Sequence, residues 1–550
     1  MRISQIEIGN FRSIHRQRFK ADNVNILLGE NDVGKSNVLH ALNLFFQPTK
    51  RANFSDVHSD IESRLLSIKV TFEITDKNII PNDIHSHIYD NYLVIHRKHP
   101  IHKNPKYYDK KGKQIDLTRL RRFFRDRFIY IPTIRDAAQH EKIVTLIHEL
   151  IENPSEYLGK TVSEEAEKAT RRLDKYMAKH LKDFTTLLCK NLNTEDVKIT
   201  FAPDVDEILS LAKIRIGRKE FVGRLQSRGQ GIQSLTLINL YRAMAKKASG
   251  FKVLALEEPE AHLHPNLLRS FAQDIFSNTE DMQIFLTTHS PFIVDQAKLS
   301  NIVRIVARDS KTIFIKPKKI SGVEPNFYKY VHAKQSDIFF AKHVLLVEGP
   351  SDKLFLTTIS SKISYSRYQQ KQQCDFELHG VVALENEGKG FKNTIPILEL
   401  FEIPWSILCD KDAWEKGPLI SLIEKTGLKL KKPKIFRKLK EHHDAGHDLD
   451  LKIISLLGKF NIFCINGKLE DFIITEKSKP KVYNVLKNLF PKRFEEAKSQ
   501  QKDTNEDAFL KKILVDEKRI WPKPLAIELA SEDIHEEIVK NIQQIVGELN

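Results

Sequence analysis

Short apolar runs that end in glycine or in acidic residues recur along the chain, and stretches with helical periodicity separate them. Residues 24–28, VNILL, lead into a glycine-rich turn and then into the helical pattern NVLHALNLFF. Comparable apolar runs occupy residues 253–256, 344–347, 380–384 and 405–409. Strands that alternate with helices predict an α/β fold with parallel sheets, whose carboxyl ends gather the polar residues.

A different pattern runs from about Arg135 to Asn193. Heptad-like stretches such as EKIVTLIHELIENP replace the strand and helix alternation there. Such stretches are typical of packed helical hairpins. The sequence therefore predicts a helical insert over residues 136–193, and a chain of 550 residues is long enough for about two to four domains.

Charge and cysteine content narrow the class of protein. The formal charge of +16 favours a polyanionic partner, although solubility alone also accounts for it. The four cysteines form no CxxC pair, so neither a disulfide framework nor a structural zinc site is predicted. No apolar run reaches the roughly 20 residues of a membrane span. We expect a cytoplasmic protein without a membrane partner.

The glycine-rich turn Gly29–Ser36, GENDVGKS, has the GxxxxGK[ST] pattern of a phosphate loop between a strand and a helix. Its backbone N–H groups would surround the phosphates, Lys35 would reach the β and γ oxygens, and the Ser36 hydroxyl would bind magnesium. The sequence therefore predicts ATP as a cofactor. The nearby residues assigned to the same site are Arg12, Asn31, Gly34 and Asn37.

Two later strands supply the groups that phosphoryl transfer requires. The run Val253–Leu256 ends at Glu257 and Glu258, where one carboxylate can hold the magnesium shell and the other can polarise a water. A third strand, QIFLTTHSP, ends at His289, which is placed to touch a γ-phosphate or to cap the strand.

A polar turn before a long amphipathic helix completes this set. Ser227, Gly229 and Gln230 lie in the segment SRGQG, and helix N-termini attract anions. The turn resembles the signature motif of ABC-type ATPases. Together with IEIGNFRSI near the start, these motifs resemble the ATPase of the OLD (overcoming lysogenization defect) family, related to RecF and SMC heads. The resemblance implies at least a homodimer, since the signature turn of one head closes over the nucleotide of another.

One position departs from the broader ABC pattern. Glu257 stands where aspartate is usual, and the longer side chain loosens the expected magnesium contact, so slow hydrolysis is one expectation. The sequence leaves open whether ATP is hydrolysed or only held.

A second group of acidic residues follows strands further along the chain. Glu348 follows the run 344–347, and Asp352 lies one helical turn later. Asp410 and Asp412 follow WSILC, on an extended chain that would point both the same way. Carboxylates gathered at one sheet edge repel one another unless a cation lies between them. A structural alternative is a surface acid pair that caps helices.

A strand-end glutamate followed by DxD resembles the Toprim domain shared by topoisomerases, primases and OLD nucleases. The resemblance implies two Mg²⁺ or Mn²⁺ ions that clamp a phosphodiester, bound by Glu348, Asp352, Asp410 and Asp412. It also implies Glu470 as a further metal ligand and Lys523 as a stabiliser of transition-state charge, although Asp471 and other lysines lie nearby.

Two basic segments are candidate DNA contacts. The lysine-rich stretch 425–440 reads as a phosphate-tracking surface or as a solvated loop, and the hairpin around Lys110–Lys113 has the same two interpretations. The histidines at 442, 443 and 447 do not have a zinc pattern.

These observations predict an ABC/RecF-like ATPase domain over residues 1–135 and 194–325, a helical dimerisation insert over 136–193, and a Toprim nuclease domain with a C-terminal helical region over 326–550. The favoured function is a metal-dependent DNA endonuclease of OLD type, which in that family serves bacterial defence against phage, alone or with a partner protein or nucleic acid encoded nearby. The alternative is a RecF-like repair ATPase whose second domain binds DNA without cutting. A topoisomerase- or primase-like function is disfavoured, because no tyrosine or polymerisation module is apparent.

Overall fold

The computed structural model divides into two compact units, residues Met1–Lys318 and Lys319–Asn550, and each is described by itself. It describes residues 1–57, 65–77, 80–100, 103–125, 127–133, 172, 174–192, 196–201, 212–218, 221–224, 229–247, 251–261, 263–277, 282–317, 336–367, 370–385, 391–416, 418–499 and 506–547. Most of the predicted helical insert, residues 134–171, therefore lies outside the described residues. The predicted α/β fold class is confirmed.

The first unit contains a six-stranded sheet of order β16-β15-β3-β14-β13-β9. All neighbouring pairs are parallel except β15 with β16. The strands are β3 (Val24–Leu28), β9 (Phe128–Ile131), β13 (Lys252–Glu257), β14 (Met282–Thr287), β15 (Ile302–Arg308) and β16 (Lys311–Ile315). Strands β3, β13 and β14 are buried along their whole length, as their continuous apolar runs predict.

A second, antiparallel sheet of the first unit shares its core with the helix that follows the phosphate loop. Its strands are β1 (Arg2–Phe11), β2 (Ile14–Lys20), β4 (Leu65–Glu73), β5 (Ile88–Tyr89), β6 (Tyr92–Pro100), β7 (Lys106–Tyr108) and β8 (Gln114–Ile115). The buried side of this sheet packs in one cluster with α1 (Lys35–Phe45) and α2 (Leu117–Phe124). Strands β7 and β8 form the predicted basic hairpin.

One buried cation of the second sheet fixes the end of α1. The guanidinium of Arg97, on β6, donates hydrogen bonds to the carbonyls of Leu44, Gln47 and Lys50. These carbonyls lie in the last turn of α1 and just beyond it, where helical partners are missing. The antiparallel sheet therefore holds the helix that the phosphate loop begins.

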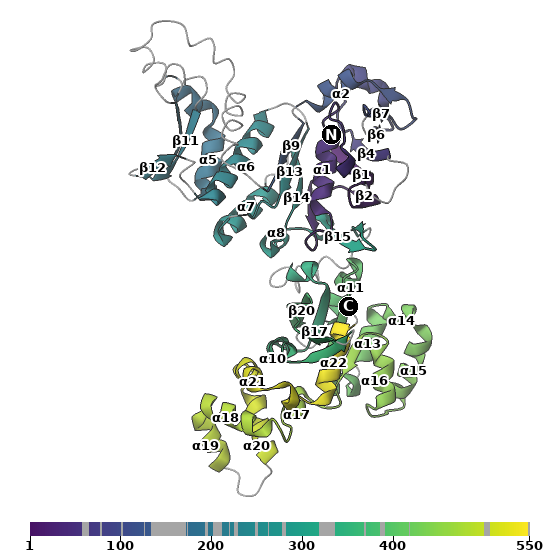
Figure 1. Ribbon diagram of the computed structural model, residues 1–550, viewed down its shortest axis with the longest axis vertical. Coiled ribbons are helices and arrows are strands. Elements are labelled where there is room, and N and C mark those ends of the chain that lie inside the picture. The colour runs from purple at the N-terminus through teal and green to yellow at the C-terminus, as the bar shows by residue number, and fades with distance from the viewer. Residues whose placement is uncertain are drawn as a thin grey trace. The chain divides into compact units, whose positions relative to one another are not determined.

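The remaining elements of the first unit flank the parallel sheet (Figure 1). They are α5 (Lys182–Leu192), β10 (Asp196–Phe201), β11 (Ala212–Arg218), β12 (Phe221–Arg224), α6 (Gln230–Lys247), α7 (Pro265–Ser277) and α8 (Pro291–Val294). Strands β10, β11 and β12 form a separate antiparallel sheet.

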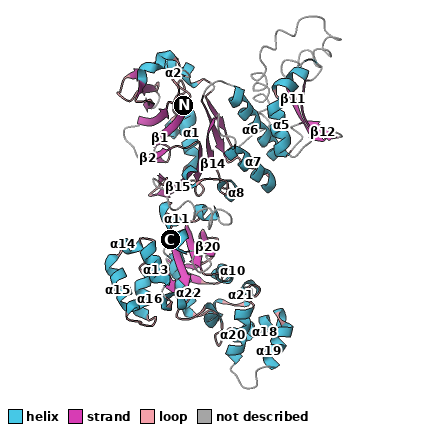
Figure 2. Cartoon of the chain, turned by 180° about the vertical axis from the view of Figure 1, so that it is seen from behind, coloured by secondary structure: helices cyan, strands magenta, loops and turns pink. Residues whose placement is uncertain are grey.

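The second unit is built around a fully parallel sheet of order β20-β17-β21-β22. Its strands are β17 (His343–Val347), β20 (Val381–Glu385), β21 (Trp405–Cys409) and β22 (Ile462–Cys464). A small hairpin joins β18 (Ser364–Arg367) to β19 (Gln370–Gln373). Figure 2 shows that helices make up most of this unit around the sheet.

The helices of the second unit include two groups that project from the sheet. The helices are α10 (Pro350–Ser360), α11 (Phe391–Leu400), α12 (Asp412–Glu415), α13 (Pro418–Lys425), α14 (Leu428–Lys431), α15 (Pro433–Asp444), α16 (Leu451–Gly458), α17 (Leu469–Ile473), α18 (Lys479–Leu489), α19 (Pro491–Ser499), α20 (Glu506–Asp516), α21 (Pro522–Glu528) and α22 (Glu536–Gly547). Helices α13–α16 form one group and α18–α20 the other (Figure 1). Within the described ranges, no helix is long and apolar enough to cross a membrane.

Candidate metal centre and nucleotide site

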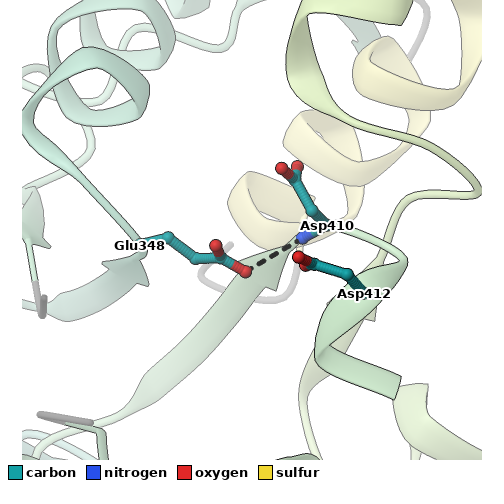
Figure 3. A group of neighbouring side chains, drawn as sticks. All are labelled: Glu348, Asp410 and Asp412. Carbon is teal, nitrogen blue, oxygen red and sulfur yellow. Dashed lines mark hydrogen bonds between the residues drawn. The ribbon is translucent and has the colours of Figure 1, made fainter. Parts of the chain in front are cut away.

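The acidic cluster lies at the carboxyl ends of two neighbouring parallel strands. Glu348 follows β17 and Asp410 follows β21, and these strands pair directly. The Asp410 backbone N–H donates to Glu348 Oε1 at 3.2 Å. Carboxylate oxygens of Glu348, Asp410 and Asp412 all lie within 4.8 Å of one another, so they can share one cation (Figure 3). The predicted DxD motif and strand-end glutamate therefore converge.

Asp412 occupies the more open side of this trio. It is the first residue of α12, and its Oδ2 accepts from Lys416 Nζ at 2.7 Å, one turn later. The Asp412 side chain is 35% exposed, so water reaches this ion pair. A cation that enters the cluster would compete with Lys416 for Asp412.

Asp352 is fixed at the first turn of α10. Its Oδ2 accepts from the Gly349 backbone N–H at 2.9 Å, which turns the helix start toward the end of β17. The hydroxyl of the neighbouring Ser351 donates to the Lys518 carbonyl at 2.8 Å. The start of α10 thereby also holds the segment before α21 in place.

Lys518 is a second cation beside the acidic residues, on the Glu470 side, and the sequence did not single it out. Its Nζ lies 2.5 Å from Oε1 of Glu470, whose side chain is 3% exposed. Glu470 Oε2 is buried without a hydrogen-bond partner among the described residues. The predicted lysine, Lys523, is exposed on α21, and no hydrogen bond or ion pair of the described residues joins it to the cluster. The two lysines are only five positions apart, so strand and helix patterns alone give no means of choosing between them.

Burial and mutual repulsion oppose the ionisation of the acidic cluster. Burial, followed by the charges of Glu348, Asp352, Glu470 and Asp412, raises the pKa of Asp410 to about 8. Burial raises the pKa of Asp352 to about 6. Burial likewise raises the pKa of Glu348. The clustered carboxylates of Glu348, Asp410 and Asp412 supply the oxygen ligands that a hard divalent cation prefers. Glu470 Oε2, which is buried without a partner among the described residues, is a further oxygen of this kind.

The raised pKa of Asp410 leads to a stability prediction for the metal-free protein. The folded state binds a proton that an unfolded aspartate, with a pKa of about 3.9, has released, so the free energy of unfolding decreases as pH rises from about 4 to about 8. Asp410→Asn removes the contribution of Asp410 to this decrease, whereas Asp352 and Glu348 retain theirs. Urea unfolding of wild type and variant across that pH range, in EDTA, measures the difference; parallel pH profiles would show that Asp410 ionises freely.

The phosphate loop is closed around its own lysine. Lys35 Nζ donates to the Gly29 carbonyl at 3.2 Å and to the Glu30 carbonyl at 2.6 Å. Burial lowers the pKa of Lys35, whereas nearby acids, Glu258 first among them, raise it. A nucleotide phosphate would replace these two carbonyls as the acceptor of Lys35.

Gly34 allows close contact between the loop and β16. Its φ is +97°, and a Cβ at this position would lie 2.4 Å from Thr312 Oγ1 and 2.5 Å from Ser13 Oγ. Thr312 Oγ1 donates to the Val33 carbonyl at 2.8 Å. Thr312, which the sequence did not single out, therefore braces the loop from a strand far along the chain.

Arg12 and Asn37 meet beside the start of α1. Arg12 Nη1 donates to Asn37 Oδ1 at 3.2 Å, and the same guanidinium pairs with Asp56 at 3.2 Å. Ser36 is half-buried, whereas Asn31 is exposed. The predicted residues of the loop and of the N-terminal strand thus surround one short segment of backbone.

The two glutamates after β13 have different surroundings. Glu257 Oε2 accepts from the Tyr130 hydroxyl at 2.7 Å and from the Thr133 backbone at 3.4 Å. Glu258 has a φ of +42°, and its Oε1 lies 3.6 Å from His289 Nε2. Burial, and then the charge of Lys35, lower the pKa of His289. Glu258, His289 and Lys35 are therefore electrostatically linked.

Glu260, which the sequence did not single out, holds the backbone at His289 by a hydrogen bond. Its Oε1 accepts from the Thr288 hydroxyl at 2.7 Å and from the His289 backbone at 2.5 Å. Burial raises the pKa of Glu260. The sequence feature that could have pointed to Glu260 is the PEAH segment just after Glu257 and Glu258, because an acid so close to the end of β13 can reach the end of the next strand, β14.

The signature turn is only partly described. Ser227 lies outside the described residues. Gly229 and Gln230 are exposed at the start of α6, and no hydrogen bond or ion pair within the described part of the chain joins them to the phosphate loop. The structure therefore does not bring these predicted residues to the nucleotide site of the same chain.

Removal of the Lys35 ammonium tests the nucleotide site. Lys35→Ala is expected to weaken ATP binding at least about 100-fold, because no other ammonium lies in the loop to neutralise the β and γ oxygens. Calorimetric titration with ATP measures the affinity. Lys50→Ala, which removes an exposed lysine beyond α1, is the control, and equal affinities of the two variants would contradict the assignment.

Two protein-family models match the chain. The AAA ATPase domain family matches residues 1–139 and 123–294, which together make up more than half of the chain. The overcoming lysogenization defect protein-like TOPRIM domain family matches residues 339–412, which include Glu348, Asp352, Asp410 and Asp412.

Several characterised proteins are similar over large parts of their length. The chain is 23% identical over 471 residues to Endonuclease GajA of Bacillus cereus (strain VD045), covering 78% of each protein. It is 23% identical over 471 residues to the Old nuclease of Escherichia phage P2, covering 75% of this chain and 77% of that one. It is 21% identical over 313 residues to the OLD nuclease of Thermus scotoductus (strain ATCC 700910 / SA-01), covering 54% and 55%.

Solved structures add a comparison of the fold. A crystal structure of an Smc head bound to the C-winged helix domain of ScpA covers 57% of this chain and 97% of its own, with 14% identity and a TM-score of 0.42. The family matches, the order of the two domains and the converging acidic residues agree with one another. The chain belongs to the AAA ATPase domain family, and its second unit contains an overcoming lysogenization defect protein-like TOPRIM domain.

Proposed function

We propose that the protein is a metal-dependent DNA endonuclease of OLD type that binds ATP. The observation that carries the proposal is the convergence of Glu348, Asp410 and Asp412 at the ends of two paired strands. The relatives named endonuclease or nuclease support the same activity. The acidic cluster lies at the sheet edge where parallel α/β folds place their active sites.

The residues proposed to bind metal are Glu348, Asp352, Asp410, Asp412 and Glu470. Two Mg²⁺ or Mn²⁺ ions at this centre would supply an activated water and neutralise charge on the leaving oxygen of the phosphodiester. The backbone N–H of Asp410 orients Glu348, and the N–H of Gly349 orients Asp352, so both carboxylates are preorganised. Glu470 keeps one oxygen without a partner among the described residues, which leaves it available as a ligand.

Lys518 is the proposed cation for charge that builds up on the phosphate. It lies against Glu470 and close enough to Asp352 and Asp410 for their charges to raise its pKa, although burial acts in the opposite direction. This position takes the role that the sequence suggested for Lys523. A fixed ammonium beside the reacting phosphate stabilises the transition state without reorganisation.

The ATPase unit is proposed to bind ATP and Mg²⁺ through Lys35, Ser36 and Glu257, with Glu258 and His289 facing the γ-phosphate. Arg12, Asn31, Gly34 and Asn37 complete the surroundings of the phosphates. The hydrogen bond from the Tyr130 hydroxyl fixes the carboxylate of Glu257.

The proposed assembly is a homodimer or a higher homo-oligomer. Gly229 and Gln230 are exposed and are not bonded to the phosphate loop of their own chain, which suits a turn that closes the nucleotide site of a second copy. The proposed domain limits remain 1–135 with 194–325, 136–193 and 326–550. We further propose a cytoplasmic role in defence against phage, with a partner protein or nucleic acid encoded nearby.

Amide substitutions in the cluster test the nuclease proposal. Asp410→Asn and Glu348→Gln keep the side-chain shape but remove the charge that attracts the cation, so magnesium- or manganese-dependent plasmid cleavage is expected to fall at least about 100-fold. Glu377→Gln, at an exposed acid outside the cluster, is the control. Gel-shift binding of DNA should persist in all three variants.

Two results would oppose this proposal. Cleavage that survives both amide substitutions would make the cluster structural. Wild-type protein that binds DNA without cutting it, over a range of divalent metals and with or without ATP, would favour the RecF-like alternative.

A pair of lysine variants tests the reassignment from Lys523 to Lys518. Lys518→Met removes the ammonium beside Glu470 and is expected to lower the single-turnover cleavage rate at least about 30-fold. Lys523→Met, on the exposed face of α21, is expected to stay within about two-fold of wild type. Rapid-quench cleavage at saturating DNA measures both rates, and the reverse order of effects would restore Lys523.

A further inference from the structure

The lysine-rich stretch after the DxD motif, which the sequence left as a phosphate-tracking surface or a solvated loop, is helical. Helices α14 and α15 cover most of residues 428–444 and pack with α13 and α16 as one group (Figure 1). The helical geometry determines which of the basic side chains share a face. It therefore separates two classes of cation in this stretch.

Three of the lysines are held by other parts of the second unit. Lys431 pairs with Glu399 on α11, and Lys432 donates to the Lys459 carbonyl after α16. Lys440 pairs with Glu424 on α13 at 3.0 Å. These contacts fasten α14 and α15 to their neighbours, so these lysines have a structural role.

Three other cations share one face of α15. Lys434, Arg437 and Lys438 are exposed and spaced i, i+3 and i+4, which places them together on the helix surface. Leu439 is fully buried on the opposite side. Within the described part of the chain, no carboxylate pairs with any of the three. One carboxylate, Glu441, lies a turn further on along the same face.

This arrangement is unfavourable for an isolated helix. Lys434 lies in the first turn, where the helix dipole disfavours a cation, and the first turn of α15 contains no acidic residue. Lys434 and Lys438 are also like charges at i, i+4, which repel one another. An anion along this face would relieve both effects.

Helix α15 and the segment after it contact α12, the short helix that begins at Asp412. Trp414, two residues after Asp412, is 1% exposed, and its Nε1 donates to the His447 carbonyl at 3.0 Å. Its ring lies edge-on to His443, near the end of α15, at 5.3 Å. At 1.5 Å per residue, Lys438 and Lys434 lie about 8 and 14 Å before His443 along the helix axis.

We propose that the Lys434, Arg437 and Lys438 face of α15 binds the phosphate backbone of duplex DNA beside the Toprim metal centre. The inference rests on the proposed nuclease function and extends it to the path of the substrate. Lys434 and Lys438 are about 6 Å apart along the helix, which matches about two base pairs of duplex at 3.4 Å each. Phosphate contacts of this kind fix register without reading sequence.

The test replaces the three cations by glutamine, which preserves the helix. Lys434→Gln/Arg437→Gln/Lys438→Gln is expected to flatten the slope of log affinity against log salt by about 2 to 3, since each lost phosphate contact contributes about 0.9. Binding to a fluorescent duplex in Ca²⁺ at several salt concentrations measures the slope. Cleavage in Mg²⁺ below saturation is expected to fall in parallel with the loss of affinity.

A matched variant removes the same charge from the other helical group. Lys487→Gln/Lys492→Gln/Lys498→Gln alters exposed residues of α18 and α19 and is expected to leave the salt slope nearly unchanged. Equal slopes in wild type and in the α15 variant, with wild type still cutting, would overturn this proposal and leave the nuclease function intact. Equal losses in the two triple variants would reduce the effect to net charge and would also overturn it.

Discussion

Repulsion among carboxylates at the carboxyl end of a small parallel sheet is the constraint on which the second unit depends. The pairing of β17 with β21 forces Glu348 and Asp410 together, and the start of α12 adds Asp412. Burial raises the pKa of Asp410 to about 8 because water cannot screen its neighbours. A fold that keeps such a cluster loses stability near neutral pH unless a cation is bound, so the cluster is better explained by function than by packing.

The candidate nucleotide site of the first unit is also formed by residues at the carboxyl ends of parallel strands. Glu257 and Glu258 follow β13, and the phosphate loop follows β3, with β14 between these strands. The two sites differ in how the charge is balanced. The charge of Glu258 raises the pKa of Lys35 against the effect of burial, whereas Lys518 pairs with one glutamate beside four other acids. The nucleotide site can therefore exist without metal more easily than the Toprim centre can.

The sequence predicts strand-end residues well and partners from distant segments poorly. Glu348 and Asp410 were predictable because a buried apolar run fixes where its strand ends, and neighbouring parallel strands end at one edge. Lys518 and Thr312 were not predictable, because each lies in a distant segment that only tertiary packing brings to its site. Glu260 was not predictable either, because Glu257 and Glu258 lie nearer to the strand end and already supplied the two carboxylates that phosphoryl transfer requires.

The lysine-rich stretch 425–440 shows the same limit of sequence-based prediction for basic residues. Composition alone cannot separate a lysine that fastens one helix to another from a lysine that faces solvent, yet only the second can displace counterions from DNA. Lys431 and Lys440 are paired with Glu399 and Glu424 within the second unit, so they add to the number of basic residues without adding to the net charge or to a phosphate surface. Under the proposed function, the electrostatic contribution to DNA binding would therefore come from cations that have no carboxylate partner and not from total charge, and, within the described residues, helix α15 places three such cations on one exposed face.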